Sequence, residues 1–142
     1  MSEPTASSEP IGQPRIRVVL VDDHAMMRGV IKMALETADD IEVVGEAADG
    51  EAALRVCAET HPDVVLMDLR LPRLSGVATT RALQDQNPVP KVLVLTADAD
   101  ERHIKEALAA GASGYLLKIA RIEELHAAVR ATHEGRTATP PK

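Results

Sequence analysis

The stretch Val64-Val65-Leu66-Met67-Asp68-Leu69-Arg70-Leu71-Pro72 decides how this chain is interpreted. Its first four residues are apolar and two of them are β-branched, which is typical of a short strand buried on both faces. The run stops at a carboxylate, so Asp68 is expected at the carboxyl end of the strand. Ligands bind at that edge of an open α/β sheet, because the strand ends and their loops form a crevice there. Taken alone, the position favours the simpler interpretation that Asp68 only ends the strand.

Short apolar runs alternate with amphipathic segments along the rest of the chain. In the segments between the runs, apolar residues recur every three or four positions, as on one face of a helix. Five such pairs predict the α/β class, with a doubly wound five-stranded parallel sheet covered by helices on both faces. The predicted strands are 16–21, 41–46, 64–68, 91–96 and 114–117, and the predicted helices are 25–36, 50–60, 77–85, 101–110 and 122–132.

Local signals mark the ends of these elements and of the domain. Asp49 and Asp100 stand where helix N-caps are expected, and Gly111 is a candidate for the residue just past the fourth helix. We expect a disordered leader in residues 1–15, one folded domain in residues 16–134, and a flexible tail or the start of a linker in residues 135–142.

The composition argues against several classes of function. The formal net charge of −6 disfavours a nucleic-acid-binding surface, because clustered Lys and Arg drive such binding. Cys57 is the only cysteine, which excludes a disulfide framework and suits a reducing cytoplasm. No apolar run approaches the roughly 20 residues of a membrane span. We therefore expect a cytoplasmic protein in which this chain binds neither nucleic acid nor a membrane.

Polar residues stand at the ends of four predicted strands. Asp22 and Asp23 follow the first strand, Asp68 ends the third, Thr96 ends the fourth and Lys118 follows the fifth. Because parallel strands bring their carboxyl ends to one edge, we expect these five side chains to lie together. Each has a simpler explanation by itself, such as a helix cap or a solvated cation. Capping does not account for their joint placement.

The chemistry of this set points to phosphoryl transfer. Three carboxylates packed together repel one another unless a cation enters, and carboxylates with water are the ligands of Mg²⁺. A carboxylate can also be a covalent nucleophile that accepts a phosphoryl group, a transfer that needs mainly positioning and charge neutralisation. Mg²⁺ and Lys118 would provide the charge, and Thr96 would donate its hydroxyl to a phosphate oxygen. The residues therefore predict an aspartyl-phosphate site.

Four motifs resemble the response-regulator receiver domains of bacterial two-component systems, and the resemblance covers residues 16 to about 132. The motifs are VDDH at 21–24, MDLRLPRLSG at 67–76, LTA at 95–97 and GYLLK at 114–118. The first and last are most similar to the subfamily that carries a LuxR-type helix-turn-helix after the receiver. This resemblance implies a flavodoxin-like (β/α)5 fold with strand order 2-1-3-4-5.

The resemblance also implies a role for each site residue. Asp68 is the phosphoacceptor, and Lys118 and Thr96 contact the phosphoryl group. Mg²⁺ is held by Asp22, Asp23 and Asp68 with the backbone carbonyl of Arg70. The partner is a sensor histidine kinase, and the chain is not an enzyme beyond its own phosphorylation and dephosphorylation.

Thr96 and Tyr115 match the family's switch residues. Phosphorylation is expected to shift an existing equilibrium and remodel the surface of the fourth helix, fifth strand and fifth helix. That surface, or one formed by the first and fifth helices, would then form a homodimer. The output would be a LuxR-type DNA-binding domain not present in this chain; the alternative is a stand-alone relay or adaptor.

Arg70 and Asp98 are expected at the rim of the site, each two residues past a strand-end residue. Their pair would obstruct the water that hydrolyses the acyl phosphate, or Asp98 would instead orient that water. Ile119 follows Lys118 where many receivers have a proline in a cis peptide, and the sequence leaves the isomer of the Lys118–Ile119 bond open.

Three other functions fit less well. A hydrolase of the haloacid-dehalogenase type with Asp22 as nucleophile requires a second aspartate two residues on, where His24 stands. A flavodoxin-like cofactor carrier requires Ser, Thr and Gly in its first loop, and a single tyrosine leaves little to stack on a flavin. A degenerate receiver that acts only as a binding module is disfavoured because every expected site residue is present.

Overall fold

The computed structural model describes residues 14–97 and 100–136. The strands are β1 (Ile16–Val21), β2 (Ile41–Ala47), β3 (Val64–Met67), β4 (Lys91–Thr96) and β5 (Gly114–Leu117), and the helices are α1 (Ala25–Glu36), α2 (Gly50–Thr60), α3 (Gly76–Leu83), α4 (Glu101–Ala109) and α5 (Ile122–His133). These are the ten predicted elements, with ends shifted by at most two residues. Most of the expected leader and tail, and Asp98, lie outside the described residues.

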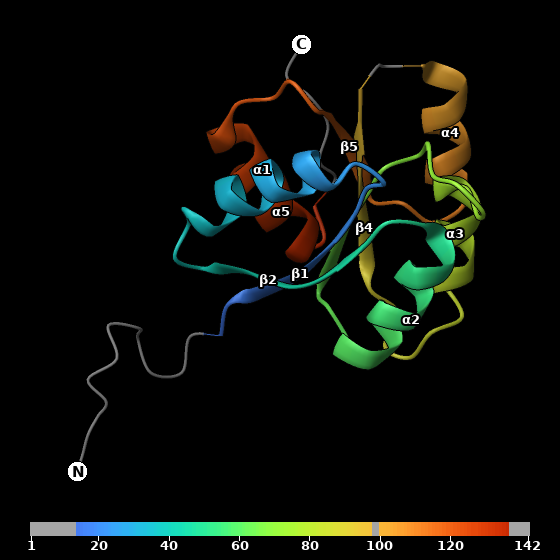
Figure 1. Ribbon diagram of the computed structural model, residues 1–142, viewed down its shortest axis with the longest axis horizontal. Helices are drawn as coiled ribbons and strands as arrows, with labels where there is room; N and C mark the ends of the chain where they lie inside the picture. Colours follow the sequence, from blue (N-terminus) through green and yellow to red (C-terminus); the bar gives the residue numbers. More distant parts are fainter. Residues whose placement is uncertain (1–13, 98–99, 137–142) are drawn as a thin grey trace.

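The five strands form one parallel sheet in the order β2-β1-β3-β4-β5. Helices α1 and α5 cover one face, and α2, α3 and α4 cover the other (Figure 1). The predicted doubly wound fold and its strand order are therefore confirmed. In the register of neighbouring strands, Val21 pairs with Met67 and Met67 pairs with Val94. The residues that follow β1 and β3 consequently leave the sheet side by side.

The central strand has the double-sided burial that its sequence predicts. Val64 and Leu66 belong to the core under α1 and α5, whereas Val65 and Met67 belong to the core on the opposite face. All four are at most 2% exposed. Both faces of β3 are thus packed against helices, and Asp68, which follows the strand directly, is itself buried at the edge of the sheet.

Local hydrogen bonds account for the ends of the elements. Asp49 caps α2 by accepting from the Ala52 N–H at 2.8 Å, and Asp100 caps α4 by accepting from the Arg102 N–H at 3.0 Å. Gly111 follows α4 with a φ of +122°, a conformation that favours glycine. These three predictions are confirmed.

Two features of the backbone answer open points. The predicted strand 64–68 ends one residue early, because the Asp68 carboxylate turns back to accept from the Arg70 N–H at 3.0 Å. Among residues 14–97 and 100–136, Asn87–Pro88 is the only cis peptide, so the Lys118–Ile119 bond is trans.

No helix in those ranges combines the length and hydrophobicity needed to cross a membrane.

Candidate functional site

Asp22 and Asp68 lie next to each other at the carboxyl edge of the sheet. The Asp68 N–H donates to the carbonyl of Val21 at 3.0 Å, and the Asp22 N–H donates to the carbonyl of Ala47 at 3.1 Å. Both residues are buried, with 3% and 6% of their surface exposed. Burying two neighbouring carboxylates is unfavourable unless their charge is compensated. The arrangement therefore requires a cation.

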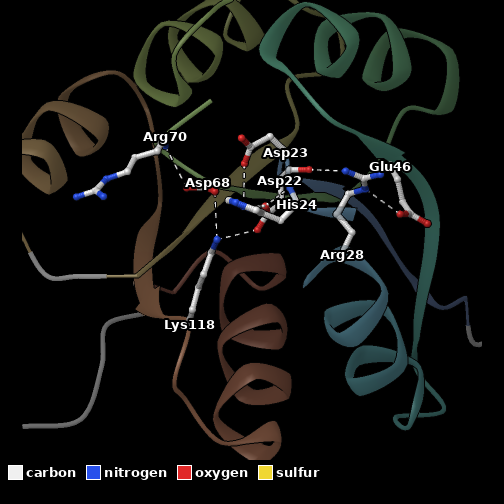
Figure 2. A network of polar contacts seen from close by, with 8 residues as sticks. All are labelled: Asp22, Asp23, His24, Arg28, Glu46, Asp68, Arg70 and Lys118. Atoms are coloured by element: carbon white, nitrogen blue, oxygen red, sulfur yellow. Dashed lines mark hydrogen bonds and ion pairs between the residues drawn. The ribbon is translucent and has the colours of Figure 1, made fainter. Parts of the chain in front are cut away.

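Lys118 is that cation in the described structure. It follows β5, and its backbone N–H donates to the carbonyl of Thr96 at 2.7 Å. Its side chain extends under the site, where Nζ donates to Asp22 Oδ2 at 2.7 Å and to Asp68 Oδ2 at 3.1 Å (Figure 2). One ammonium thus joins two carboxylates from different strands, and the three groups together keep one net negative charge.

The other oxygen of each carboxylate is held by the backbone. Asp22 Oδ1 accepts from the His24 N–H at 2.8 Å, just as Asp68 Oδ1 accepts from the Arg70 N–H. Both are local turns of the kind that aspartate favours two residues before a backbone donor. Each carboxylate is therefore fixed in orientation, with Oδ2 toward the lysine and Oδ1 toward its own loop.

The electrostatics follow from burial and from this pairing. Burial by itself raises the pKa of the Asp22 carboxyl, but the hydrogen bonds from Lys118 and from the His24 backbone, with the Lys118 charge, outweigh it and lower that pKa. Burial likewise opposes the charged form of Lys118, yet the bonds to Asp22 and Asp68 raise the pKa of its ammonium. Asp22 and Lys118 are accordingly ionised at neutral pH.

A group of possible metal ligands lies beside this pair. Among the described residues, Asp22, Asp23 and His24 each offer one ligand atom within 4.8 Å of the others. The His24 imidazole Nδ1 lies 3.0 Å from Asp23 Oδ1. Mg²⁺ prefers oxygen ligands and keeps several bound waters. The carboxylates of Asp22 and Asp23 offer such oxygens, and Asp23 is exposed, so water can reach the ion. The donor set therefore fits the predicted cation.

This group shares two members, Asp22 and Asp23, with the ligands that the family resemblance implies. The resemblance adds Asp68 and the Arg70 carbonyl to these two, whereas the structure places His24 with them. Asp68 instead directs one oxygen to Lys118 and the other to a backbone N–H. His24 is a residue that the sequence analysis did not assign to the site, although its position directly after two aspartates was a usable signal.

The remaining predicted residues surround the site. Thr96 is buried at the end of β4, and Tyr115 on β5 is half-buried against the apolar layer shared with α2, α3 and α4. Arg70 is exposed, and its guanidinium points away from the Asp68 carboxylate (Figure 2). Asp98 lies outside the described residues, so its pairing with Arg70 stays a prediction.

Two further residues reach the site without any signal in the sequence. Arg28, on α1, donates from Nη1 to the Asp22 carbonyl at 2.6 Å and from Nε to Glu46 Oε1 at 3.1 Å. Glu46 is the second-last residue of β2. An arginine six residues after an aspartate forms no recognisable motif, so only the fold reveals this contact.

A family-wide sequence model described as the response regulator receiver domain matches residues 18–130. The chain belongs to this family. It is a receiver domain of the response regulators of two-component systems, as its motifs predict. The match begins within β1, covers the other four strands completely and ends within α5.

Individual relatives agree with this assignment. The transcriptional regulatory protein DegU of Brevibacillus brevis is 38% identical over 135 residues, which cover 95% of this chain and 57% of DegU. The signal receiver domain of the response regulator NarL from Mycobacterium tuberculosis is 36% identical, with a TM-score of 0.82 over 87% of this chain and 99% of that one.

A response regulator of the LuxR family from Aurantimonas sp. SI85-9A1 has the same identity and TM-score, over 87% of this chain and 88% of that one. The similarity to LuxR-type regulators is therefore confirmed. The chain spans little more than half the length of DegU and of other curated relatives that it matches.

Proposed function

We propose that this chain accepts a phosphoryl group on Asp68 from a sensor histidine kinase and passes on the signal through a change of its surface. The observation that carries the proposal is the convergence of Asp22, Asp68 and Lys118, from three different strands, on one buried cluster. Perturbed, buried ionisable groups at the edge where α/β sheets bind ligands are typical of functional sites.

In the proposed reaction, a carboxylate oxygen of Asp68 forms a bond to phosphorus while the bond between phosphorus and the kinase histidine nitrogen breaks. Lys118 Nζ, already 3.1 Å from Asp68 Oδ2, would pair with a phosphoryl oxygen. Asp22 and Asp23, with Asp68 and the Arg70 carbonyl, would hold Mg²⁺. When bound, that ion would neutralise charge on the transferred group. Beyond this self-modification we propose no enzymatic activity.

We further propose that Thr96 and Tyr115 form the switch. Thr96 ends β4 and Tyr115 lies on β5, next to it in the sheet, where Leu117 pairs with Thr96. A phosphoryl oxygen bound by the Thr96 hydroxyl would draw in the loop after β4 and let Tyr115 move, which changes the surface of α4, β5 and α5. Arg70 and Asp98 would control dephosphorylation at the rim.

Phosphorylation would lead to a homodimer, and exposed apolar side chains favour the α1 and α5 surface for it. Met26, Val30 and Met33 recur along one side of α1 and are 58–85% exposed. Val30 and Met33 line an apolar groove of about 420 Å³ between α1 and α5, which Ile122 also lines. A second copy of this chain, with the same apolar surface, is the occupant we propose.

We propose that residues 16–134 are the receiver unit, that 1–15 and 135–142 flank it as leader and linker, and that the protein acts in the cytoplasm. The output we favour is transcription control through a LuxR-type DNA-binding domain. This proposal is supported by relatives that are named transcriptional regulators and are almost twice as long as the matched region.

Intact-mass measurement after treatment with acetyl phosphate and Mg²⁺ tests the proposed function. Wild type should gain one phosphoryl group, Asp68→Asn should gain none, and the exposed control Asp40→Asn should behave as wild type. A hydrolase of the haloacid-dehalogenase type would instead lose its phosphoryl group in Asp22→Asn and keep it in Asp68→Asn. Labelling that persisted in Asp68→Asn would overturn the assignment of the phosphoacceptor.

A further inference from the structure

Arg28 connects the acidic site to the edge strand of the sheet. Its side chain is only 18% exposed, and it extends from α1 toward the loop after β1 (Figure 2). Nη1 donates to the Asp22 carbonyl at 2.6 Å, and Nε donates to Glu46 Oε1 at 3.1 Å. One guanidinium therefore bridges the backbone of a buried site residue and a carboxylate on β2.

This bridge completes the support of Asp22. Its N–H donates to the Ala47 carbonyl, its Oδ1 accepts from the His24 N–H, and its Oδ2 accepts from Lys118. The carbonyl oxygen is the remaining polar atom, and Arg28 is its donor. Because Glu46 and Ala47 are adjacent in β2, both backbone groups of Asp22 are tied to the end of the same strand.

The charges of the bridge are balanced. An unpaired guanidinium this close to the acidic site would repel a divalent cation, because like charges at short range raise the free energy of the bound state. Glu46 offsets the charge of Arg28, so the pair holds the loop of Asp22 and Asp23 without placing a net positive charge beside it. A small cavity of about 10 Å³ is lined by Arg28, Asp22 and Asp68, among others.

We propose that Arg28 and Glu46 are positioning residues that set the affinity of the acidic site for a divalent cation by fixing the backbone of Asp22. The inference rests on the proposed function in one respect, the binding of Mg²⁺ near Asp22 and Asp23. Residues that orient metal ligands from outside the coordination shell affect metal affinity by about 10–100-fold when they are replaced.

Calorimetric titration with MgCl₂ tests this proposal on the intact chain. Arg28→Ala should raise the Kd for Mg²⁺ about tenfold. Glu46→Gln should also weaken binding, and more at low salt, because it leaves the Arg28 charge uncompensated near the cation. Arg130→Ala is the matched control, because it removes a two-bonded pair with Asp40 outside the site and should leave the Kd unchanged.

A measurement on the metal-free protein separates positioning from general loss of stability. In amide NMR spectra, Arg28→Ala should shift the His24 N–H resonance, whose hydrogen bond to Asp22 Oδ1 depends on the held loop, whereas Arg130→Ala should not. Arg28→Lys, which keeps a charged donor, should restore part of the affinity. If Arg28→Ala does not fold, Arg28→Lys and Glu46→Gln provide the test.

The outcomes distinguish this inference from the proposed function. If wild type binds Mg²⁺ and both Arg28→Ala and Glu46→Gln bind it equally well, the positioning role is wrong and the proposed function stands. If wild type binds no Mg²⁺ while Asp68 is still phosphorylated, the metal part of the proposal and the positioning role both fall.

Discussion

The two edges of the sheet both carry ion pairs, but the pairs differ in burial. At the carboxyl edge, Lys118 bonds to Asp22 and Asp68, and the three side chains are 4–13% exposed. Near the amino edge, Arg130 of α5 bonds through two nitrogens to Asp40, which precedes β2, and these side chains are 42% and 48% exposed. The pair in which two nitrogens of one side chain bond to both oxygens of one carboxylate is thus the exposed pair, whose charges water already solvates.

The exposed pair of Arg130 and Asp40 connects two parts of the fold, whereas the buried group of Lys118, Asp22 and Asp68 forms a candidate site. An exposed pair contributes only about 0–1 kcal/mol and can be replaced with little effect. A buried group of two carboxylates and one lysine keeps a net charge in a place where stability alone would favour apolar residues. Proteins retain such groups at functional sites, so the carboxyl edge is where chemistry is expected.

Removing the buried cation should have the largest effect on stability. Lys118→Met leaves two buried carboxylates without a partner, which should lower the free energy of unfolding by about 3 kcal/mol at pH 7. Arg130→Met, the matched change at the other edge, should lower it by no more than about 1 kcal/mol. Urea unfolding measures both. Equal losses would mean that the two edges do not differ in the way their burial indicates.

Mg²⁺ should stabilise the folded protein by binding at the carboxyl edge of the sheet and not at the amino edge. A ligand that binds only the folded state at about 100 times its Kd adds about 2.7 kcal/mol to the free energy of unfolding. Thermal unfolding of wild type should therefore move to higher temperature with MgCl₂. Asp23→Ala should reduce this shift, and Asp40→Ala should preserve it. An unmoved wild-type curve at high Mg²⁺ concentration would contradict the assignment of a metal site.

The loss of stability at acid pH should become smaller when Lys118 is removed. In wild type the pKa of Asp22 lies below its ordinary 3.8, so its contribution is present above that pH and is lost as the pH falls through the lowered value. Lys118 has a pKa raised above its ordinary 10.5, so its contribution is lost as the pH rises through that higher value.

In Lys118→Met the hydrogen bond and the charge of Lys118 are lost, whereas burial, which raises the pKa of Asp22, and the His24 backbone hydrogen bond, which lowers it, both remain. The pKa of Asp22 should therefore lie above its wild-type value. The variant should therefore lose less stability than wild type as the pH falls below about 4, because Lys118 no longer holds Asp22 ionised. Urea unfolding at a series of pH values gives both profiles. Parallel profiles would show that Lys118 does not control the ionisation of Asp22.

The sequence predicted the carboxyl edge far better than its surroundings. Strand ends can be recognised in the sequence itself, because an apolar run that stops at an aspartate places that residue at the carboxyl edge of the sheet. This pattern predicts the positions of Asp22, Asp68 and Lys118. The strand order comes from the family resemblance instead. The helix caps Asp49 and Asp100 were also predictable, because their donors lie two or three residues along the chain.

Contacts that depend on the packing of two elements could not be predicted. Arg28 reaches Asp22 and Glu46 only because α1 packs against β2, and Arg130 reaches Asp40 only because α5 packs against α1. The sequence does not assign His24 to the site, since a single histidine after two aspartates also fits the start of a helix. Its side chain lies instead beside Asp22 and Asp23.

The central claim is that the buried charges at the carboxyl edge serve phosphorylation of Asp68, and chemical mapping of the modified residue tests it most directly. Protein treated with acetyl phosphate and Mg²⁺ is reduced with borohydride, which converts an aspartyl phosphate to homoserine, and the peptides are sequenced by mass spectrometry. Homoserine is expected at position 68 and nowhere else. Homoserine at position 22 or 23 with aspartate unchanged at 68, or no homoserine at all, would contradict it.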